Sequence, residues 1–184
     1  MKTVKASKSL LRLISARCDM FYALEAYSMF INAQSTPAAE HFFCSMATAY
    51  GRPFTENYGV GSIKCEYPNY PDFSDPEMNQ RHQRLMDLRN KFLAHSSAEG
   101  TRVMIVPPDV ENPVTGRKDS SFDHNVGKRV FIDQRFADWL IEVVHAFKER
   151  LDKDVAAKLA SEFGVAGHSE LFELETNWND FRWS

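Results

Sequence analysis

Apolar residues recur along most of this chain at the three- and four-residue steps of an amphipathic α-helix. The pattern is clearest between about Ser7 and Ala33, which predicts a first long helix. Its apolar stripe is predicted at Leu10, Ile14, Phe21, Leu24, Ser28 and Ile31, widened by Leu13, Met20 and Tyr27. A stripe of this width is expected of a helix that faces a protein core.

Three further helices are predicted from local start and stop signals. Thr36, followed by a proline, is typical of an N-cap, and the helix that it opens ends near Gly51. Asp75, also followed by a proline, opens a third helix that runs to about Ser96. Asp133 can cap a fourth helix, whose apolar stripe is regular.

A shorter helix is predicted at residues 154–163, and two strands are predicted at residues 102–106 and 129–132. An acidic, aromatic tail extends from about residue 168 to the end. The polar stretch between the two strands makes them a β-hairpin insert at about 101–133. The prediction is therefore a single domain, residues 1–184, of mainly α class. It is a bundle of four to five helices that carries a small hairpin insert.

The composition excludes several classes of protein. Of the 184 residues, 43% are hydrophobic and 26% are charged, which is typical of a folded domain and not of a disordered chain. The formal net charge of −3 argues against a surface that is basic throughout. Any contact with nucleic acid is therefore expected to be local.

The cysteines and histidines do not indicate a disulfide framework or a metal site. Cys18, Cys44 and Cys65 are odd in number and contain no C-x-x-C pair, which favours a reducing cytoplasm. Cys18 and Cys44 fall in apolar helical pattern and are expected to be small buried side chains. Since no H-x-x-x-H pair occurs, no metal or other cofactor is expected. No signal peptide and no long uncharged apolar run is found, which predicts a cytoplasmic protein outside the membrane.

The third predicted helix contains residues that break its apolar pattern. On a helical wheel with about 100° per residue and Leu85 as the reference direction, Arg89 lies at about 40°, inside the apolar stripe, and His82 lies close to it at about 60°. His95 lies at about 80° on the opposite side of the stripe. One interpretation is an arginine that snorkels or pairs with a carboxylate, and a histidine at an ordinary helix end. The other is that the stripe meets a second subunit around a polar cleft that holds Arg89 and His95.

The segment from Leu88 to His95, LRNKFLAH, resembles the R-x(4–6)-H motif of HEPN-like proteins (higher eukaryotes and prokaryotes nucleotide-binding). Asn90 after the arginine, an alanine before the histidine and two serines after it match the branch related to abortive-infection proteins. The stretch AYGRPFT, residues 49–55, is similar to one found upstream of the motif in that branch. The hairpin insert and the acidic tail lie outside the shared pattern.

The resemblance implies a HEPN-like helical bundle that forms a homodimer and brings two copies of the motif together. Many members are metal-independent endoribonucleases, and others are binding modules without catalytic activity. The motif roles transfer to Arg89 and His95 as catalytic residues, with Asn90 as their polar companion. The expected function is cleavage of RNA to 2′,3′-cyclic phosphate products in a defence or toxin–antitoxin setting, with an antitoxin protein among the expected partners. The alternative is a non-catalytic HEPN-like bundle that binds nucleotide or a protein partner.

These residue types suit RNA cleavage without a metal. A histidine that titrates near neutrality can accept and donate protons, and an arginine offers a permanent, bidentate contact to phosphate. Arg52 and His82 are further candidates for phosphate contacts in the cleft. The other basic residues of the third helix, such as Arg81, are expected on a solvated face more than along an RNA path.

Overall fold

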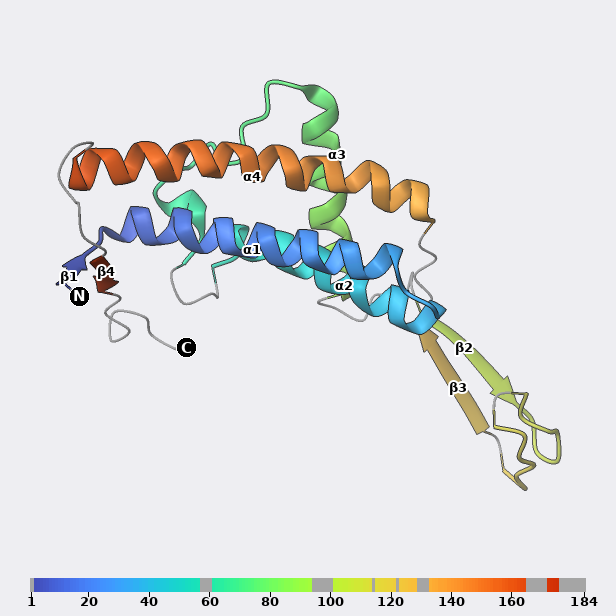
Figure 1. Cartoon of the computed structure of the whole chain (residues 1–184). Helices are drawn as coiled ribbons and strands as arrows, with labels where there is room; N and C mark the ends of the chain where they lie inside the picture. Colours follow the sequence, from blue (N-terminus) through green and yellow to red (C-terminus); the bar gives the residue numbers. More distant parts are fainter. Residues whose placement is uncertain are drawn as a thin grey trace.

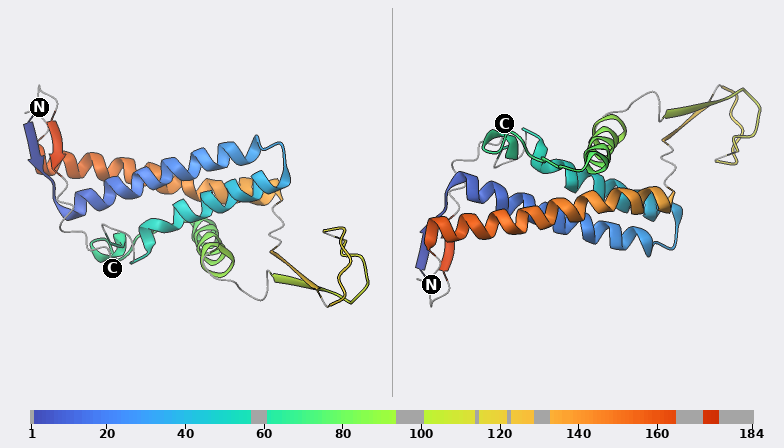
Figure 2. Two further views of the ribbon diagram at one scale, coloured as in Figure 1. Left: turned by 90° about the horizontal axis from the view of Figure 1, so that it is seen from below. Right: turned by 90° about the horizontal axis from the view of Figure 1, so that it is seen from above.

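Three long helices lie side by side and a fourth crosses them in the computed structural model (Figure 1). The structure describes residues 2–56, 61–93, 101–113, 115–121, 123–128, 133–164 and 172–175. In these residues the α-helices are α1 (Lys8–Ile31), α2 (Thr36–Gly51), α3 (Pro76–Asp87) and α4 (Gln134–Phe163). The predicted mainly α class is confirmed. α3 is the crossing helix, and the two views of Figure 2 show the same arrangement from below and above.

Short polar side chains determine where most helices begin. Ser7, Asp75 and Asp133 precede α1, α3 and α4, and each accepts a hydrogen bond from a backbone N–H two or three residues later, at 2.8 to 3.1 Å. These bonds satisfy N–H groups that have no partner inside the helix. The predicted caps Asp75 and Asp133 are confirmed. α2 already includes Thr36, so that its cap position is Ser35 and not the predicted Thr36.

The hydrophobic core lies between α1, α2 and α4 and continues to α3. Its large, fully buried side chains are Leu10, Leu13, Met20, Phe43, Met46, Tyr50, Ile63, Leu85, Leu140, Val143, Phe147 and Leu151. Ile63 belongs to η2 (Ile63–Cys65), one of two short 3₁₀ helices between α2 and α3, the other being η1 (Arg52–Phe54). The connection between α2 and α3 therefore contributes a side chain to the core.

The buried face of α1 differs from the predicted stripe. It includes Ala16 and Ala23, both fully buried, whereas Phe21 and Ile31 are 47% and 46% exposed and Ser28 is exposed. The hydrophobic pattern gives most weight to large side chains. Close packing of α1 against both α2 and α4 favours small ones, so the prediction was wrong at these three positions.

Phe21 and Cys18 are both exposed on α1. The Phe21 ring packs against two cations, with the Lys148 Nζ 4.5 Å and the Arg17 Cζ 5.3 Å from its centroid. Cys18 is exposed, so its predicted burial is wrong, and Cys44 on α2 is partly buried. Both errors on α1 follow from the same misplaced buried face, because Cys18 and Phe21 are three residues apart.

The fourth helix continues without a break to Phe163. The prediction of a separate helix at 154–163 is therefore wrong. Two ion pairs at i, i+4 spacing span the expected junction, Lys148 with Asp152 at 2.7 Å and Arg150 with Asp154 at 3.6 Å. Such pairs favour helix across a polar stretch that the apolar pattern treats as an end.

Two pairs of strands extend from the helices. β2 (Thr101–Val106) pairs antiparallel with β3 (Asp123–Lys128), and β1 (Lys2–Lys5) pairs parallel with β4 (Phe172–Glu175), which lies in the predicted tail. The second strand of the hairpin thus lies before the predicted segment 129–132, which is outside the described residues. The β2–β3 hairpin projects beyond the end of the bundle where α1 turns into α2 and α4 begins (Figures 1 and 2).

Candidate functional site

The motif begins where α3 changes into a turn of π-helix, η3 (Leu88–Leu93). Leu85 and Leu88 are buried, as the predicted stripe requires. A π-helix holds more residues per turn than an α-helix, so the angles predicted for positions beyond Leu88 do not apply. Single π-helical turns occur frequently at functional sites, because they turn side chains away from the regular helical faces.

Arg89 lies against the end of α2 and is half-buried. A Cβ atom at Gly51 would stand only 3.0 Å from the Arg89 Cγ, so the glycine makes room for the stem of this side chain. The Arg89 Nη1 donates a hydrogen bond of 2.8 Å to the Oδ1 of Asn90, which is exposed. Within the described part of the chain, no carboxylate forms an ion pair with Arg89. The predicted companions Arg89 and Asn90 are therefore in direct contact.

Arg52 lies one residue after Gly51 and faces α1. Its Nη1 donates a hydrogen bond to the Asp19 Oδ1 at 3.3 Å. Burial raises the pKa of Asp19, and the arginine acts in the opposite direction. Arg52 thus joins the end of α2 to α1 beside the motif, and one of its guanidinium nitrogens contacts a carboxylate.

His82 lies in a cluster of aromatic rings between α2, α3 and α4. Its Nδ1 is 2.7 Å from the Tyr50 hydroxyl, and its ring centroid is 4.9 Å from that of Phe54. Burial, with a further contribution from the charge of Lys64, lowers the pKa of His82 to about 4. A neutral imidazole packed against aromatic rings suits a structural contact better than a contact to phosphate.

We expect His82 to make the stability of the protein depend on pH. Its pKa is 6.5 in the unfolded chain and about 4 in the fold, so between these values the unfolded chain binds a proton that the folded chain does not. Stability is therefore full above pH 6.5 and falls by up to about 3 kcal/mol as the pH falls to 4. The free energy of unfolding, measured with urea between pH 4 and 7, should depend less on pH in His82→Gln than in wild type. His41→Gln, which removes an exposed histidine, is the control. The same dependence of unfolding free energy on pH in wild type and His82→Gln would show that His82 is not the group responsible.

His95 lies outside the described residues, as do the serines after it. The structure places Arg89 against Gly51 at the end of α2 and in contact with Asn90. Arg52 contacts Asp19 of α1, and His82 of α3 contacts Tyr50 in the aromatic cluster. Of the five residues predicted for the site, only Arg89 and Asn90 are thus shown in contact with each other among the described residues.

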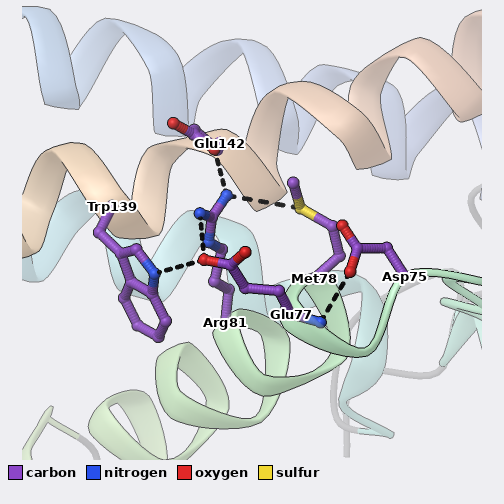
Figure 3. A network of polar contacts seen from close by, with 6 residues as sticks. All are labelled: Asp75, Glu77, Met78, Arg81, Trp139 and Glu142. Carbon is purple, nitrogen blue, oxygen red and sulfur yellow. Dashed lines mark hydrogen bonds and ion pairs between the residues drawn. The ribbon is translucent and has the colours of Figure 1, made fainter.

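Arg81 was expected on a solvated face, and this expectation is wrong because Arg81 is 6% exposed. It donates hydrogen bonds to Glu142 of α4 and to Glu77 at 2.7 Å, and its guanidinium stacks over Trp139 at 5.4 Å (Figure 3). Burial lowers the pKa of Arg81, but the two carboxylates outweigh this and raise it. Arg81 lies four residues before Leu85 and therefore on the same, buried face of α3. This spacing in the sequence could have predicted that Arg81 is buried.

An open groove of about 570 Å³ lies between α1 and α2 on the outside of the bundle. Tyr22 and Met29 of α1 and Phe42 of α2 provide apolar walls, and Glu25 and Arg52 provide charge. Arg52 lines the groove while its neighbour Gly51 contacts Arg89. The groove therefore ends one residue along the chain from the glycine that contacts Arg89.

The described residues contain neither a cluster suited to a metal ion nor a helix suited to a membrane. No group of three or more His, Cys, Asp or Glu side chains that could hold a metal ion occurs there. None of the helices described is both long and apolar enough to pass through a bilayer.

Comparisons with protein-family models, with curated proteins and with solved structures find no match for this chain. What the chain does is therefore inferred from its motif and its geometry.

Proposed function

We propose that this protein is a HEPN-like, metal-independent endoribonuclease that acts as a homodimer in the cytoplasm. Arg89 binds the scissile phosphate, Asn90 orients the guanidinium, and His95 transfers protons. The setting that the motif suggests is defence or a toxin–antitoxin pair, with an antitoxin protein as a partner.

The observation that carries the proposal is the state of Arg89. Among the described residues it donates a hydrogen bond to the neutral side-chain oxygen of Asn90 and forms no ion pair with a carboxylate. Arg81, on the same helix, is buried between two carboxylates. An arginine without an acidic partner keeps its charge available for an anion, and a guanidinium fork fits a phosphate well.

The proposed reaction assigns both proton transfers to one histidine. The His95 imidazole accepts the proton of the 2′-hydroxyl as the 2′-oxygen forms its bond to phosphorus, and the imidazolium so formed donates a proton to the 5′-oxygen as the P–O5′ bond breaks. Arg89 stabilises the charge that develops on the phosphate oxygens. The products are a 2′,3′-cyclic phosphate and a 5′-hydroxyl. Each Arg89 acts with the His95 of the other chain, so that a dimer has two such sites.

The groove between α1 and α2 supports a second candidate function. A volume of about 570 Å³ is within the range of sites that hold small molecules. A non-catalytic HEPN-like bundle that binds nucleotide or a protein partner would use such a surface without needing His95.

The two candidates are separated by incubating the purified protein with structured RNA in the presence of a chelator. The ribonuclease proposal expects cleavage with 2′,3′-cyclic phosphate ends, lost in both Arg89→Ala and His95→Ala. If wild type is as inactive as the two variants on a panel of RNAs, the enzyme proposal fails and the binding module remains.

Gly51→Ala is expected to reduce cleavage while leaving the protein folded. The added methyl group would stand 3.0 Å from the Arg89 Cγ and so displaces the side chain by a few tenths of an ångström. A displaced phosphate contact is expected to cost about tenfold in rate. The midpoint of thermal unfolding should not fall, because alanine is favoured over glycine in a helix by about 1 kcal/mol. Unchanged cleavage in Gly51→Ala would show that the position of Arg89 does not matter to the reaction.

A further inference from the structure

The last two residues of α2 contact the helical segment that carries Arg89. Gly51 contacts the stem of Arg89, and the residue before it, Tyr50, contacts His82 of α3. Since α3 continues directly into η3, His82 and Arg89 belong to one helical segment. The end of α2 is therefore joined to this segment at two neighbouring points, by packing at Gly51 and by a polar contact at Tyr50.

The contact at Tyr50 is a buried hydrogen bond whose direction can be assigned. The Tyr50 side chain is fully buried, which raises the pKa of its hydroxyl well above its usual value, so the hydroxyl keeps its proton. The His82 pKa of about 4 leaves the imidazole neutral at pH 7, with one ring nitrogen as an acceptor. A buried hydroxyl proton needs an acceptor, and within the described part of the chain that acceptor is the His82 Nδ1, 2.7 Å away. The ring proton of His82 therefore lies on Nε2.

The rings around this bond leave more freedom than the bond itself. The ring centroids of Tyr50 and His82 are 5.8 Å apart, and the Phe54 centroid lies 5.6 Å from the first and 4.9 Å from the second. Ring pairs are favourable over centroid distances of about 4.5 to 7 Å. A hydrogen bond is confined to heavy-atom distances of about 2.5 to 3.2 Å. The hydrogen bond is therefore the contact that holds α3 at one position beside the end of α2.

We infer that Tyr50 and His82 are positioning residues for Arg89. Their hydrogen bond holds the end of α2 against α3, and this keeps Gly51 in contact with the stem of Arg89. A stem held in this way leaves the guanidinium fewer orientations, which favours a defined contact to phosphate. Neither Tyr50 nor His82 contacts the phosphate itself. The effect on catalysis rests on the proposed ribonuclease function, whereas the position of Arg89 can be measured without it.

The position of Arg89 is tested by its rate of reaction with phenylglyoxal, followed by mass spectrometry of the peptide that contains it. Tyr50→Phe removes the hydroxyl and keeps the ring, so it breaks the hydrogen bond without opening a cavity. Arg89 should react about three- to tenfold faster in this variant, as expected where one hydrogen bond of ordinary strength opposes its movement. Tyr70→Phe is the matched control and should leave the rate unchanged. Tyr70 is also buried, packs 5.8 Å from Phe147 and donates its hydroxyl proton to Asp154 of α4. Equal rates in wild type and Tyr50→Phe would overturn the inference.

Two substitutions of His82 separate the hydrogen bond from the ring packing. His82→Phe keeps an aromatic ring and removes the acceptor, whereas His82→Asn removes the ring and keeps an acceptor oxygen close to the position of Nδ1. Arg89 should therefore react fast in His82→Phe, as in Tyr50→Phe, and close to the wild-type rate in His82→Asn. If Arg89 reacts as fast in His82→Asn as in His82→Phe, or faster, the ring packing positions it and the inference fails.

RNA cleavage provides the functional readout. Under single-turnover conditions in chelator, Tyr50→Phe should lower the rate about tenfold through the displaced phosphate contact. Tyr70→Phe should lower it by less than about twofold, because its hydroxyl bonds to α4 and not to the segment that carries Arg89. Wild-type cleavage by Tyr50→Phe would overturn the inference. If wild type itself is inactive, the ribonuclease proposal fails, and the reaction at Arg89 alone decides whether Tyr50 and His82 position it.

Discussion

Arg89→Ala is expected to lower the rate of RNA cleavage about 100- to 1,000-fold, the usual cost of removing one group that stabilises charge in a transition state. The stem of Arg89 lies on Gly51, and among the described residues its guanidinium has a hydrogen bond to Asn90 and no ion pair, so little of the fold depends on it. The rate is measured under single-turnover conditions in chelator, with thermal unfolding measured on the same samples.

Arg84→Ala is the matched control for this prediction. Arg84 lies on α3, is exposed, and stacks over the Phe136 ring at 5.8 Å. Its substitution removes the same charge as Arg89→Ala but at a different position. Its loss should change the rate by less than about threefold, since a single exposed charge contributes little. Equal losses in the two variants would mean that the helix attracts RNA only through its general charge.

The network around Arg81 is expected to produce the largest change in stability. Removing both carboxylates in a Glu77→Gln, Glu142→Gln double variant leaves a buried guanidinium without an anionic partner, which should cost about 3 kcal/mol or more. Arg81 is already incompletely satisfied, because its Nε has no hydrogen-bond partner among the described residues. Urea unfolding measures the free energy of unfolding for each variant.

Arg81→Met tests whether the cost comes from the buried charge. Methionine fills much of the space without carrying a charge, so the single variant should lose only about 1 kcal/mol. Added to the double variant, Arg81→Met should restore most of the lost stability. If the triple variant is the least stable of the set, the network contributes through its hydrogen bonds and not by neutralising a buried charge.

The starts of α3 and α4 could be predicted because each depends on a local signal. Asp75 and Asp133 cap α3 and α4 through side-chain bonds that need only the neighbouring backbone. The buried face of α1 could not be predicted in this way. Its alanines are buried because α2 and α4 pack closely against α1, and the sequence of α1 alone does not contain that information. The continuity of α4 depends on ion pairs that an apolar pattern does not register.

The candidate site was predictable in its residue types and less so in their surroundings. The motif identifies Arg89 and Asn90, which the structure brings into contact. The π-helical turn over residues 88–93 departs from the α-helix that the apolar pattern predicts, and the local composition contains no signal for it. His82 could be expected near the motif by its spacing, but its burial among aromatic rings depends on Tyr50 and Phe54 from another element.

The central claim is that an arginine of one chain and a histidine of the other share one site. The direct measurement mixes two inactive variants, Arg89→Ala and His95→Ala, by co-expression with different tags. Random assortment makes about half of the dimers heterodimeric, and each of these keeps one intact pair across the two-fold axis, so about a quarter of wild-type cleavage should return. If the purified mixed dimers are as inactive as the separate variants, the two residues do not act across the interface and the shared site is excluded.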